Sequence, residues 1–205
     1  MKKIVQHTML AAAAALLSLS AWAVPATYGD SGGSGQAPIT VSFVAIADGP
    51  VTGYYTGWSG GFTALVGLSI NGVDGPIGLS NHGSAYGESL VLGNALAGDK
   101  LVFFLDVAAA PARYYSDASL NHDGVNGANV NHVWVSSYAG DATLPGGLLI
   151  AFEDLPGTGA DFNYQDHGLV LANVTAVPVP EPASWALMLG GFAGLAGLSA
   201  LRRRR

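Results

Sequence analysis

The sequence predicts an all-β protein whose central part folds as a single β-sandwich of jelly-roll-like type. Short runs of β-branched and aromatic residues recur along the chain, and Gly, Asn, Asp and Pro separate them. No stretch between the two ends keeps a helical period over three turns. Several short strands with turn residues between them are typical of a β-sandwich. We place this domain at residues 39–176.

The expected strands are justified by their side-chain patterns. Ile39-Thr40-Val41-Ser42-Phe43 alternates between apolar and polar residues, as a half-buried strand does. Residues 101–105 are apolar on both faces, which predicts a strand in the middle of a sheet. The full set of expected strands is 39–47, 62–70, 88–92, 100–107, 130–138, 147–153 and 168–175.

Residues 1–23 are predicted to be a signal peptide. Two lysines precede an apolar stretch that is shorter than the roughly 20 residues needed to cross a bilayer. The small residues Ala21 and Ala23 then form the pattern that a signal peptidase recognises, so we expect cleavage after Ala23 and export. Residues 24–38, rich in Gly and Ser, are expected to be a flexible lead-in.

The C-terminal end is predicted to be a membrane anchor. Residues 183–201 carry no charge and are long enough for a transmembrane helix. A basic cluster follows at once, and such clusters stay on the cytoplasmic side. Its members are Arg202, Arg203, Arg204 and Arg205. The expected location is therefore an inner-membrane intermediate with the central domain outside.

A Pro-rich spacer at residues 177–182 precedes this helix and contains Pro180, Glu181 and Pro182. Two prolines hold the segment extended and accessible to a protease. Together with the helix and the arginines, the triplet resembles the PEP-CTERM sorting signal of Gram-negative bacteria. The resemblance implies processing by an exosortase, a membrane-embedded cysteine protease, and a final place at the cell surface or in an extracellular, exopolysaccharide-rich biofilm matrix.

Charge and composition exclude several classes of function. Residues 24–182 hold all 14 acidic residues of the chain but only two basic ones, a net charge of −12. Such a domain is a poor partner for nucleic acid, whose phosphates need Lys and Arg. The chain has no cysteine, which excludes disulfides, a thiol nucleophile and a Cys-type zinc site.

One acidic segment is a candidate Ca²⁺ site. In an extended segment, Asp161, Asn163 and Gln165 would point to one side and the aromatic Phe162 and Tyr164 to the other. Mixed carboxylate and amide oxygens suit a hard cation. The candidate ligands are Glu153, Asp154, Asp161, Asn163 and Asp166. Two alternatives remain open, namely that these residues cap turns or that two of them form a catalytic carboxylate pair.

A weaker cation candidate consists of Asp117, Asn121 and Asp123, again with turn capping as the alternative. The histidines share no metal-ligand spacing, so we expect turn or surface positions for them. Those of the central domain are His82, His122, His132 and His167. Between glycines, Tyr54, Tyr55 and Trp58 form either a stacking platform for a glycan or part of the sandwich core.

The central region also resembles the domain of unknown function 4114, over residues 40–175. The resemblance is carried by Phe103-Phe104-Leu105, Tyr115-Ser116-Asp117, Leu120-Asn121-His122-Asp123-Gly124, Asn131-His132, Phe152-Glu153-Asp154 and Asp161-Phe162-Asn163-Tyr164-Gln165-Asp166. That family typically has Asn at the position of Gln165 and Asp at that of Asn131. The resemblance implies a fold and no activity.

The sequence therefore predicts an exported, non-enzymatic surface or matrix protein, with exosortase and signal peptidase as processing partners, exopolysaccharide as a candidate partner and Ca²⁺ as a candidate ligand. The alternative is a carbohydrate-binding module that uses Tyr54, Tyr55 and Trp58. A third hypothesis, a glycan hydrolase, needs two carboxylates roughly 5–9.5 Å apart.

Overall fold

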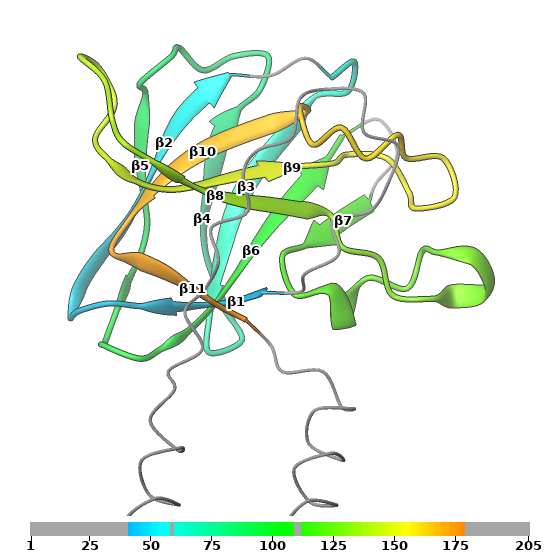
Figure 1. Cartoon of the computed structure of the whole chain (residues 1–205), viewed down its shortest axis with the longest axis horizontal. Coiled ribbons are helices and arrows are strands. Elements are labelled where there is room, and N and C mark those ends of the chain that lie inside the picture. Colours follow the sequence, from blue (N-terminus) through cyan, green and yellow to red (C-terminus); the bar gives the residue numbers. More distant parts are fainter. Residues whose placement is uncertain (1–40, 58–59, 109–111, 179–205) are drawn as a thin grey trace, which may run out of the picture.

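The computed structural model describes residues 41–57, 60–108 and 112–178. Within these ranges the chain forms eleven strands and no α-helix, which confirms the all-β prediction (Figure 1). The strands are β1 (Val41–Ala45), β2 (Gly49–Gly57), β3 (Ala64–Ile70), β4 (Val73–Ser80), β5 (Ser89–Ala95), β6 (Lys100–Val107), β7 (Ala112–Tyr115), β8 (Val133–Tyr138), β9 (Gly147–Phe152), β10 (His167–Ala172) and β11 (Val174–Pro178).

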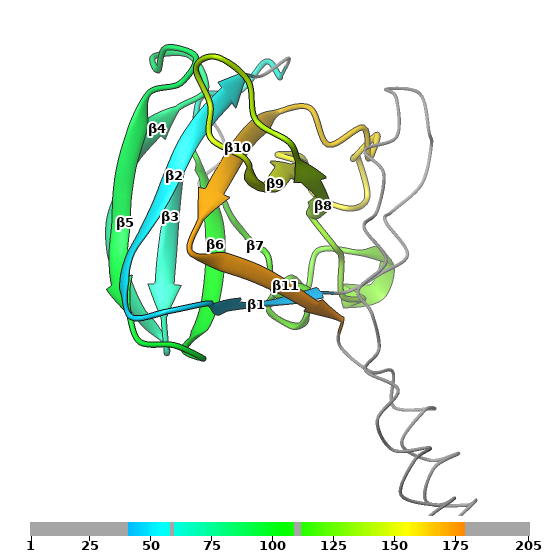
Figure 2. The same ribbon diagram turned by 60° about the vertical axis from the view of Figure 1, so that its left-hand side comes forward.

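The strands form two antiparallel sheets. The six-stranded sheet has the order β11-β1-β6-β3-β4, with β7 also paired to β6, and the five-stranded sheet has the order β5-β2-β10-β9-β8. This is a sandwich with more strands than the eight of a simple jelly roll. Its sheets approach closely where β4 meets β5 (Figure 2). A Cβ atom at Gly75 would lie only 2.3 Å from the Leu92 carbonyl oxygen, so this edge requires a glycine.

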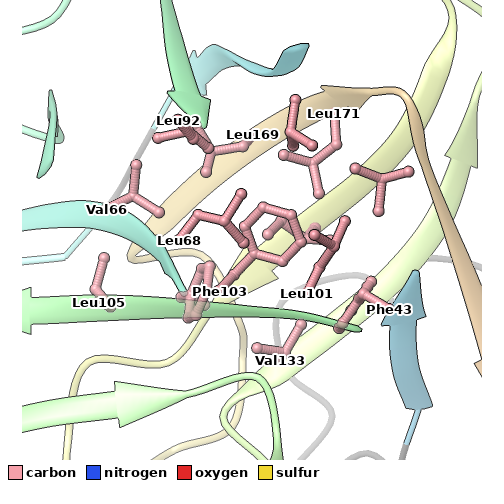
Figure 3. Packing of buried hydrophobic residues seen from close by; sticks show 14 of the residues in the cluster. Phe43, Val66, Leu68, Leu92, Leu101, Phe103, Leu105, Val133, Leu169 and Leu171 are labelled. Carbon is pink, nitrogen blue, oxygen red and sulfur yellow. The ribbon is translucent and has the colours of Figure 1, made fainter. Parts of the chain in front are cut away.

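Apolar side chains from both sheets fill the space between them. Figure 3 shows Leu68 and Phe103 of the six-stranded sheet beside Leu169 of the five-stranded sheet. Phe43 and Phe103 pack edge to face with ring centroids 5.5 Å apart, a favourable arrangement for aromatic rings. As expected, β6 lies inside its sheet, between β1 and β3, and its residues 101–105 are fully or almost fully buried.

Three strands were not predicted, namely β2, β4 and β7. β2 contains three glycines and a proline, and β4 contains Gly75-Pro76 and Gly78, residues that normally mark turns. β4 can hold Pro76 because it is the last strand of its sheet, where a missing N–H need not break a ladder hydrogen bond. β7 is only four residues long, and β6 is its strand partner among the described residues.

The single strand expected at 168–175 is two strands that belong to different sheets. The chain changes sheets at Asn173, which has the left-handed φ of 66°. Its side chain accepts a hydrogen bond from the Ala47 amide and donates one to the Ala47 carbonyl, both at 2.9 Å. At this corner, the Asn173 side chain makes the hydrogen bonds that a neighbouring strand would otherwise provide, and β11 then pairs with β1.

β1 and β11, the first and last strands described, run side by side along their whole length, from the pair Val41–Pro178 to the pair Ala45–Val174 (Figure 2). β11 includes Val177 and Pro178, which the sequence placed in the spacer. The predicted signal peptide, lead-in, Pro-Glu-Pro triplet, anchor and arginine cluster lie outside the described residues. Within the described residues, no helix has the length and apolar character to span a membrane.

Candidate metal centre

Three carboxylates meet where β9 ends and β10 begins. Glu153 and Asp154 directly follow β9, and Asp166 directly precedes β10. Because Phe152 and His167 are paired across these antiparallel strands, the residues just beyond them face each other. The Asp166 amide donates to the Phe152 carbonyl at 3.2 Å and holds the two loop ends together. The sheet itself therefore brings the acids into contact.

The three side chains are buried and close together. Their residues are 0%, 4% and 8% exposed for Glu153, Asp154 and Asp166, and one carboxylate oxygen of each lies within 4.8 Å of the other two. We call these three residues the carboxylate cluster. Among the residues that the structure describes, none of the ion pairs involves a member of this cluster.

Backbone amides neutralise part of this negative charge. The two oxygens of Glu153 accept hydrogen bonds from the Leu155 amide at 3.3 Å and the Phe162 amide at 2.8 Å. Asp166 Oδ2 accepts from the Asp154 amide at 3.0 Å. In contrast, Asp154 Oδ2 is buried without a hydrogen-bond partner. A buried oxygen of this kind costs free energy unless a proton or a cation reaches it.

Burial favours the protonated form of all three acids. Burial raises the pKa of Glu153 to about 8, with the charge of Asp166 as the next cause. Burial, again followed by the charge of Asp166, raises the pKa of Asp154 to about 7. Burial also raises the pKa of Asp166. Near neutral pH, the cluster must therefore either hold protons or bind a positive charge.

The chemistry of this donor set suits a hard divalent cation. Ca²⁺ takes six to eight oxygen ligands, and carboxylates and backbone carbonyls commonly supply them. The cluster offers only oxygens, which does not favour softer metals that prefer nitrogen or sulfur. Gly60 also lies against Asp166, since a Cβ atom at Gly60 would be 2.6 Å from Asp166 Oδ1. The loop before β3 thus closes one side of the cluster.

The other two predicted ligands of this segment lie elsewhere. Phe162 and Tyr164 have left-handed φ values of 55° and 54°, so the expectation of an extended segment is wrong. Asp161 is exposed, and its carboxylate accepts from the Asn163 amide at 3.1 Å and from the Asn163 side chain at 2.9 Å. Asn163 Oδ1 in turn accepts from the Gln165 amide. These bonds are those of the turn-capping alternative.

The weaker candidate site separates into different contacts. Asp117 caps the short 3₁₀ helix Ala118–Leu120 and pairs with Lys100 at 2.7 Å. Asn121 is buried and bonds to the backbone of Tyr115 and Val130. Asp123 Oδ2 accepts from the Gly157 amide at 2.8 Å. Each side chain therefore holds loop backbone or a basic partner, again as turn capping predicts.

His132 is a residue whose role the sequence did not reveal. It was expected in a turn or at the surface, but it is fully buried and stacked on Tyr114, with ring centroids 4.2 Å apart. Its ring lies between Asp123 Oδ2 at 2.9 Å and the Glu153 carbonyl at 3.1 Å. The Glu153 amide also donates to the His132 carbonyl. His132 thus holds the backbone of Glu153 on both sides.

His167 is buried as well, contrary to the same expectation. Its Nε2 lies 2.5 Å from the Leu79 carbonyl, and burial lowers its pKa to about 4. His82 and His122 fit the expectation better, because their hydrogen bonds to Thr63 and Asn129 are exposed. The other ring nitrogen of His167, Nδ1, is buried without a hydrogen-bond partner, although a neutral imidazole can use both of its nitrogens.

The three aromatic residues of the proposed glycan platform do not lie on one face. Tyr55 is buried, and its hydroxyl donates to the Asn81 carbonyl at 2.8 Å. Tyr54, the next residue along β2, is half-exposed on the opposite face. Trp58 lies outside the described residues. Tyr55 therefore belongs to the sandwich core, the second of the two interpretations.

The C-terminal end has a match among known protein families. Residues 178–205 match the family model of the PEP-CTERM protein-sorting motif. The chain carries a PEP-CTERM sorting motif. The motif marks exported proteins that an exosortase processes on the way to the cell surface. The match starts at Pro178, the last residue of β11.

The central domain gains no assignment from these comparisons. The family match does not extend to it, so the resemblance to the domain of unknown function 4114 is not shown. No curated protein and no solved structure matches the chain significantly. The function of the sandwich has to be argued from its own residues.

Proposed function

We propose that this chain is a non-enzymatic surface or matrix protein whose β-sandwich is stabilised by Ca²⁺ at the carboxylate cluster. The observation that carries the proposal is the burial of three carboxylates, each with an oxygen within 4.8 Å of the other two, together with the unpartnered Asp154 Oδ2. Glu153, Asp154 and Asp166 would hold the ion. Asp161 adds negative charge nearby, since its charge raises the pKa of Glu153.

The ion would act on the loop that joins β9 and β10. Its ligands come from both ends of this loop, so binding ties the end of one strand to the start of the next. Such a link stabilises only the folded state, because the ligands are far apart in an unfolded chain. Extracellular modules commonly use Ca²⁺ in this way, at affinities near 10⁻⁴–10⁻³ M.

Burial supports ion binding over hydrolysis. A glycosidase must place its two carboxylates on either side of a sugar bond, so both must be reachable by substrate. Glu153 is 0% exposed and is already bonded to two backbone amides. A small ion fits such a position and a sugar ring does not.

The sorting motif supports the proposed export of the protein to the cell surface. We propose an inner-membrane intermediate anchored by residues 183–201, exosortase processing near Pro180, Glu181 and Pro182, and association of the released domain with an exopolysaccharide matrix. The net charge of −12 over residues 24–182 also suits an environment rich in divalent cations.

Thermal unfolding of residues 24–178, with about 10 mM Ca²⁺, roughly 100 times a dissociation constant of 10⁻⁴ M, and then with chelator, tests Ca²⁺ binding. At 100 times its dissociation constant, Ca²⁺ adds about 2.7 kcal/mol, a rise in Tm of roughly 5–11 °C for a domain of this size. An unchanged Tm would reject Ca²⁺ binding at the carboxylate cluster.

Sorting is tested separately by comparing the full chain with one that lacks residues 179–205. Identical fractionation of the full and the truncated chain in cells would reject the sorting role of these residues.

A further inference from the structure

A groove lies on the outer face of the five-stranded sheet, away from the core. It encloses about 460 Å³, within the usual range of roughly 300–1,000 Å³ for small-molecule sites. Its floor contains Ala151 and Gly168, which are directly paired on neighbouring strands β9 and β10. Both residues are buried, and a Cβ atom at Gly168 would lie 2.3 Å from Thr56 Oγ1, so the Thr56 side chain lies over this glycine.

Tyrosines form the walls of this groove. Tyr86 comes from the loop before β5, Tyr138 from the end of β8, and Tyr164 from the loop before β10. Tyr86 is 51% exposed and Tyr138 is half-buried, so both can offer ring surface to a ligand. Flat rings of this kind provide large contact area at low cost in conformational entropy.

The two accessible tyrosines are held in place before any ligand arrives. Their hydroxyls both donate to Asp141 Oδ2, from Tyr138 at 2.7 Å and from Tyr86 at a shorter distance. Asp141 Oδ1 accepts from the amides of Thr143 and Leu144, both at 2.7 Å. The carboxylate therefore fixes the rings from opposite edges of the sheet, which lowers the ordering cost of binding.

The polar lining is neutral and can both donate and accept hydrogen bonds. Thr56 and Gln165 contribute a hydroxyl and a carboxamide, each able to do both. Among the described residues, no Lys or Arg lines the groove, and Asp141 places a carboxylate against Tyr86 and Tyr138; the pKa of Asp141 is lowered by its hydrogen bond from Tyr86 and then by that from Tyr138. An anionic ligand would meet only negative charge.

We propose that this groove binds a segment of a neutral polysaccharide. Sugar rings present apolar C–H faces, which can pack on the tyrosine walls. They also carry hydroxyls that donate and accept hydrogen bonds, as the Thr56 and Gln165 side chains do. This site differs from the platform of Tyr54, Tyr55 and Trp58 that the sequence suggested. It rests on the polysaccharide association in the proposed function and names a site for it, separately from the Ca²⁺ role.

Affinity electrophoresis of the full chain in detergent tests whether the groove binds a neutral polysaccharide. The probes are a mixed-linkage β-glucan, a galactomannan and a xylan as neutral chains, and alginate as the anionic chain. We expect at least one neutral probe to retard the protein, with Ca²⁺ or with chelator, and alginate to have no effect. Tyr86→Ala and Thr56→Val should weaken the retardation, by about tenfold for Tyr86→Ala because a stacking ring is lost.

Matched variants separate binding from folding. Thr56→Val keeps the shape of the side chain and removes only its hydroxyl. Tyr115→Ala removes a half-buried tyrosine of β7, in the other sheet, and should leave retardation unchanged. Variants are compared only where the Tm stays within a few degrees of the parent.

Three results would overturn the proposal: no retardation by any neutral probe, retardation by alginate alone, or equal binding by the parent, Tyr86→Ala and Thr56→Val. A dimer in analytical ultracentrifugation that Tyr86→Ala dissociates would also overturn it, because the groove would then be a contact between copies of the chain. The ion proposal is judged by Tm, so either proposal can fail alone.

Discussion

The loop between β7 and β8 and the loop between β9 and β10 contain similar acidic and amide residues but arrange them differently. In the first loop, Asp117 pairs with Lys100, and Asp123 Oδ2 accepts from the Gly157 amide and lies 2.9 Å from the ring of His132, whose pKa is lowered by burial. In the second, Glu153, Asp154 and Asp166 pack against each other, and no described ion pair reaches them. The comparison teaches that the spacing of acids along a chain does not tell whether the fold gives them separate partners or packs them together.

The largest effect is expected at His132, the residue that connects the two loops. His132→Ala removes a buried ring and leaves Asp123 and the Glu153 carbonyl without this partner. We expect a loss of about 3–5 kcal/mol in the free energy of unfolding, as for other large buried rings, measured by urea denaturation. His122→Ala, an exposed histidine of the same loop, is the control. A loss below about 1 kcal/mol would contradict the role given to His132.

Removing one charge from the carboxylate cluster should have opposite effects with and without the ion. In Asp154→Asn, repulsion falls, so the ion-free Tm at pH 8 should rise, while the gain of roughly 5–11 °C with Ca²⁺ should disappear. Asp117→Asn in the other loop should retain the full gain. If both variants respond equally to Ca²⁺, the two loops do not differ in the way described.

The pH dependence of stability should also follow the cluster. In the ion-free fold, Glu153 has a pKa raised from 4.5 to about 8, so between these values the folded state holds a proton that the unfolded state has lost. Its stability contribution is present below pH 4.5 and is lost as the pH rises through about 8. The ion-free Tm should therefore fall from pH 5 to pH 8, and Ca²⁺ should raise it more at pH 8. An ion-free Tm that rises over this range would be inconsistent with buried carboxylates.

A smaller change is expected at Gly60, which closes one side of the cluster. Gly60→Ala places a methyl group 2.6 Å from Asp166 Oδ1, so the carboxylate must shift. We expect a weaker Ca²⁺ affinity, by several-fold, with an ion-free Tm that changes little. Isothermal titration calorimetry measures the affinity, and Gly61→Ala, where a Cβ meets nothing within 4 Å, is the control.

The smallest loss of stability is expected for the ion pair between Lys100 and Asp117 of the first loop. Lys100 is 57% exposed in its side chain, so solvent screens its bond to Asp117. Lys100→Ala should cost about 0–1 kcal/mol in urea denaturation. A cost as large as that of His132→Ala would mean that the first loop also depends on a strong internal charge pair.

The strands that could be predicted are those whose side chains carry a clear pattern. The alternation at 41–43 and the apolar run 101–105 both lie in observed strands. β2 and β4 were missed because their glycines and prolines resemble turns, although Gly75 is needed where the sheets nearly touch. The corner at Asn173 could not be seen because its partner, Ala47, is far away in the chain.

The candidate site was predictable in part for the same reason. Glu153, Asp154 and Asp166 flank two strands that pattern analysis found, and antiparallel pairing brings strand ends together. The inclusion of Asp161 and Asn163 assumed an extended loop, which the left-handed residues Phe162 and Tyr164 exclude. The groove could not be foreseen, because its walls come from three separate loops and strand ends.

The pairing of β1 with β11 has a consequence for the order of folding. β1 is paired with β6 at only two positions, whereas it is paired with β11 over its whole length. Since β11 is the last of the described strands along the chain, β1 keeps an open, aggregation-prone edge on this side until residues 174–178 are in place. The sorting motif starts at residue 178. Completion of the sheet therefore coincides with the arrival of the motif, and a chain that stops short of β11 leaves β1 as a bare edge.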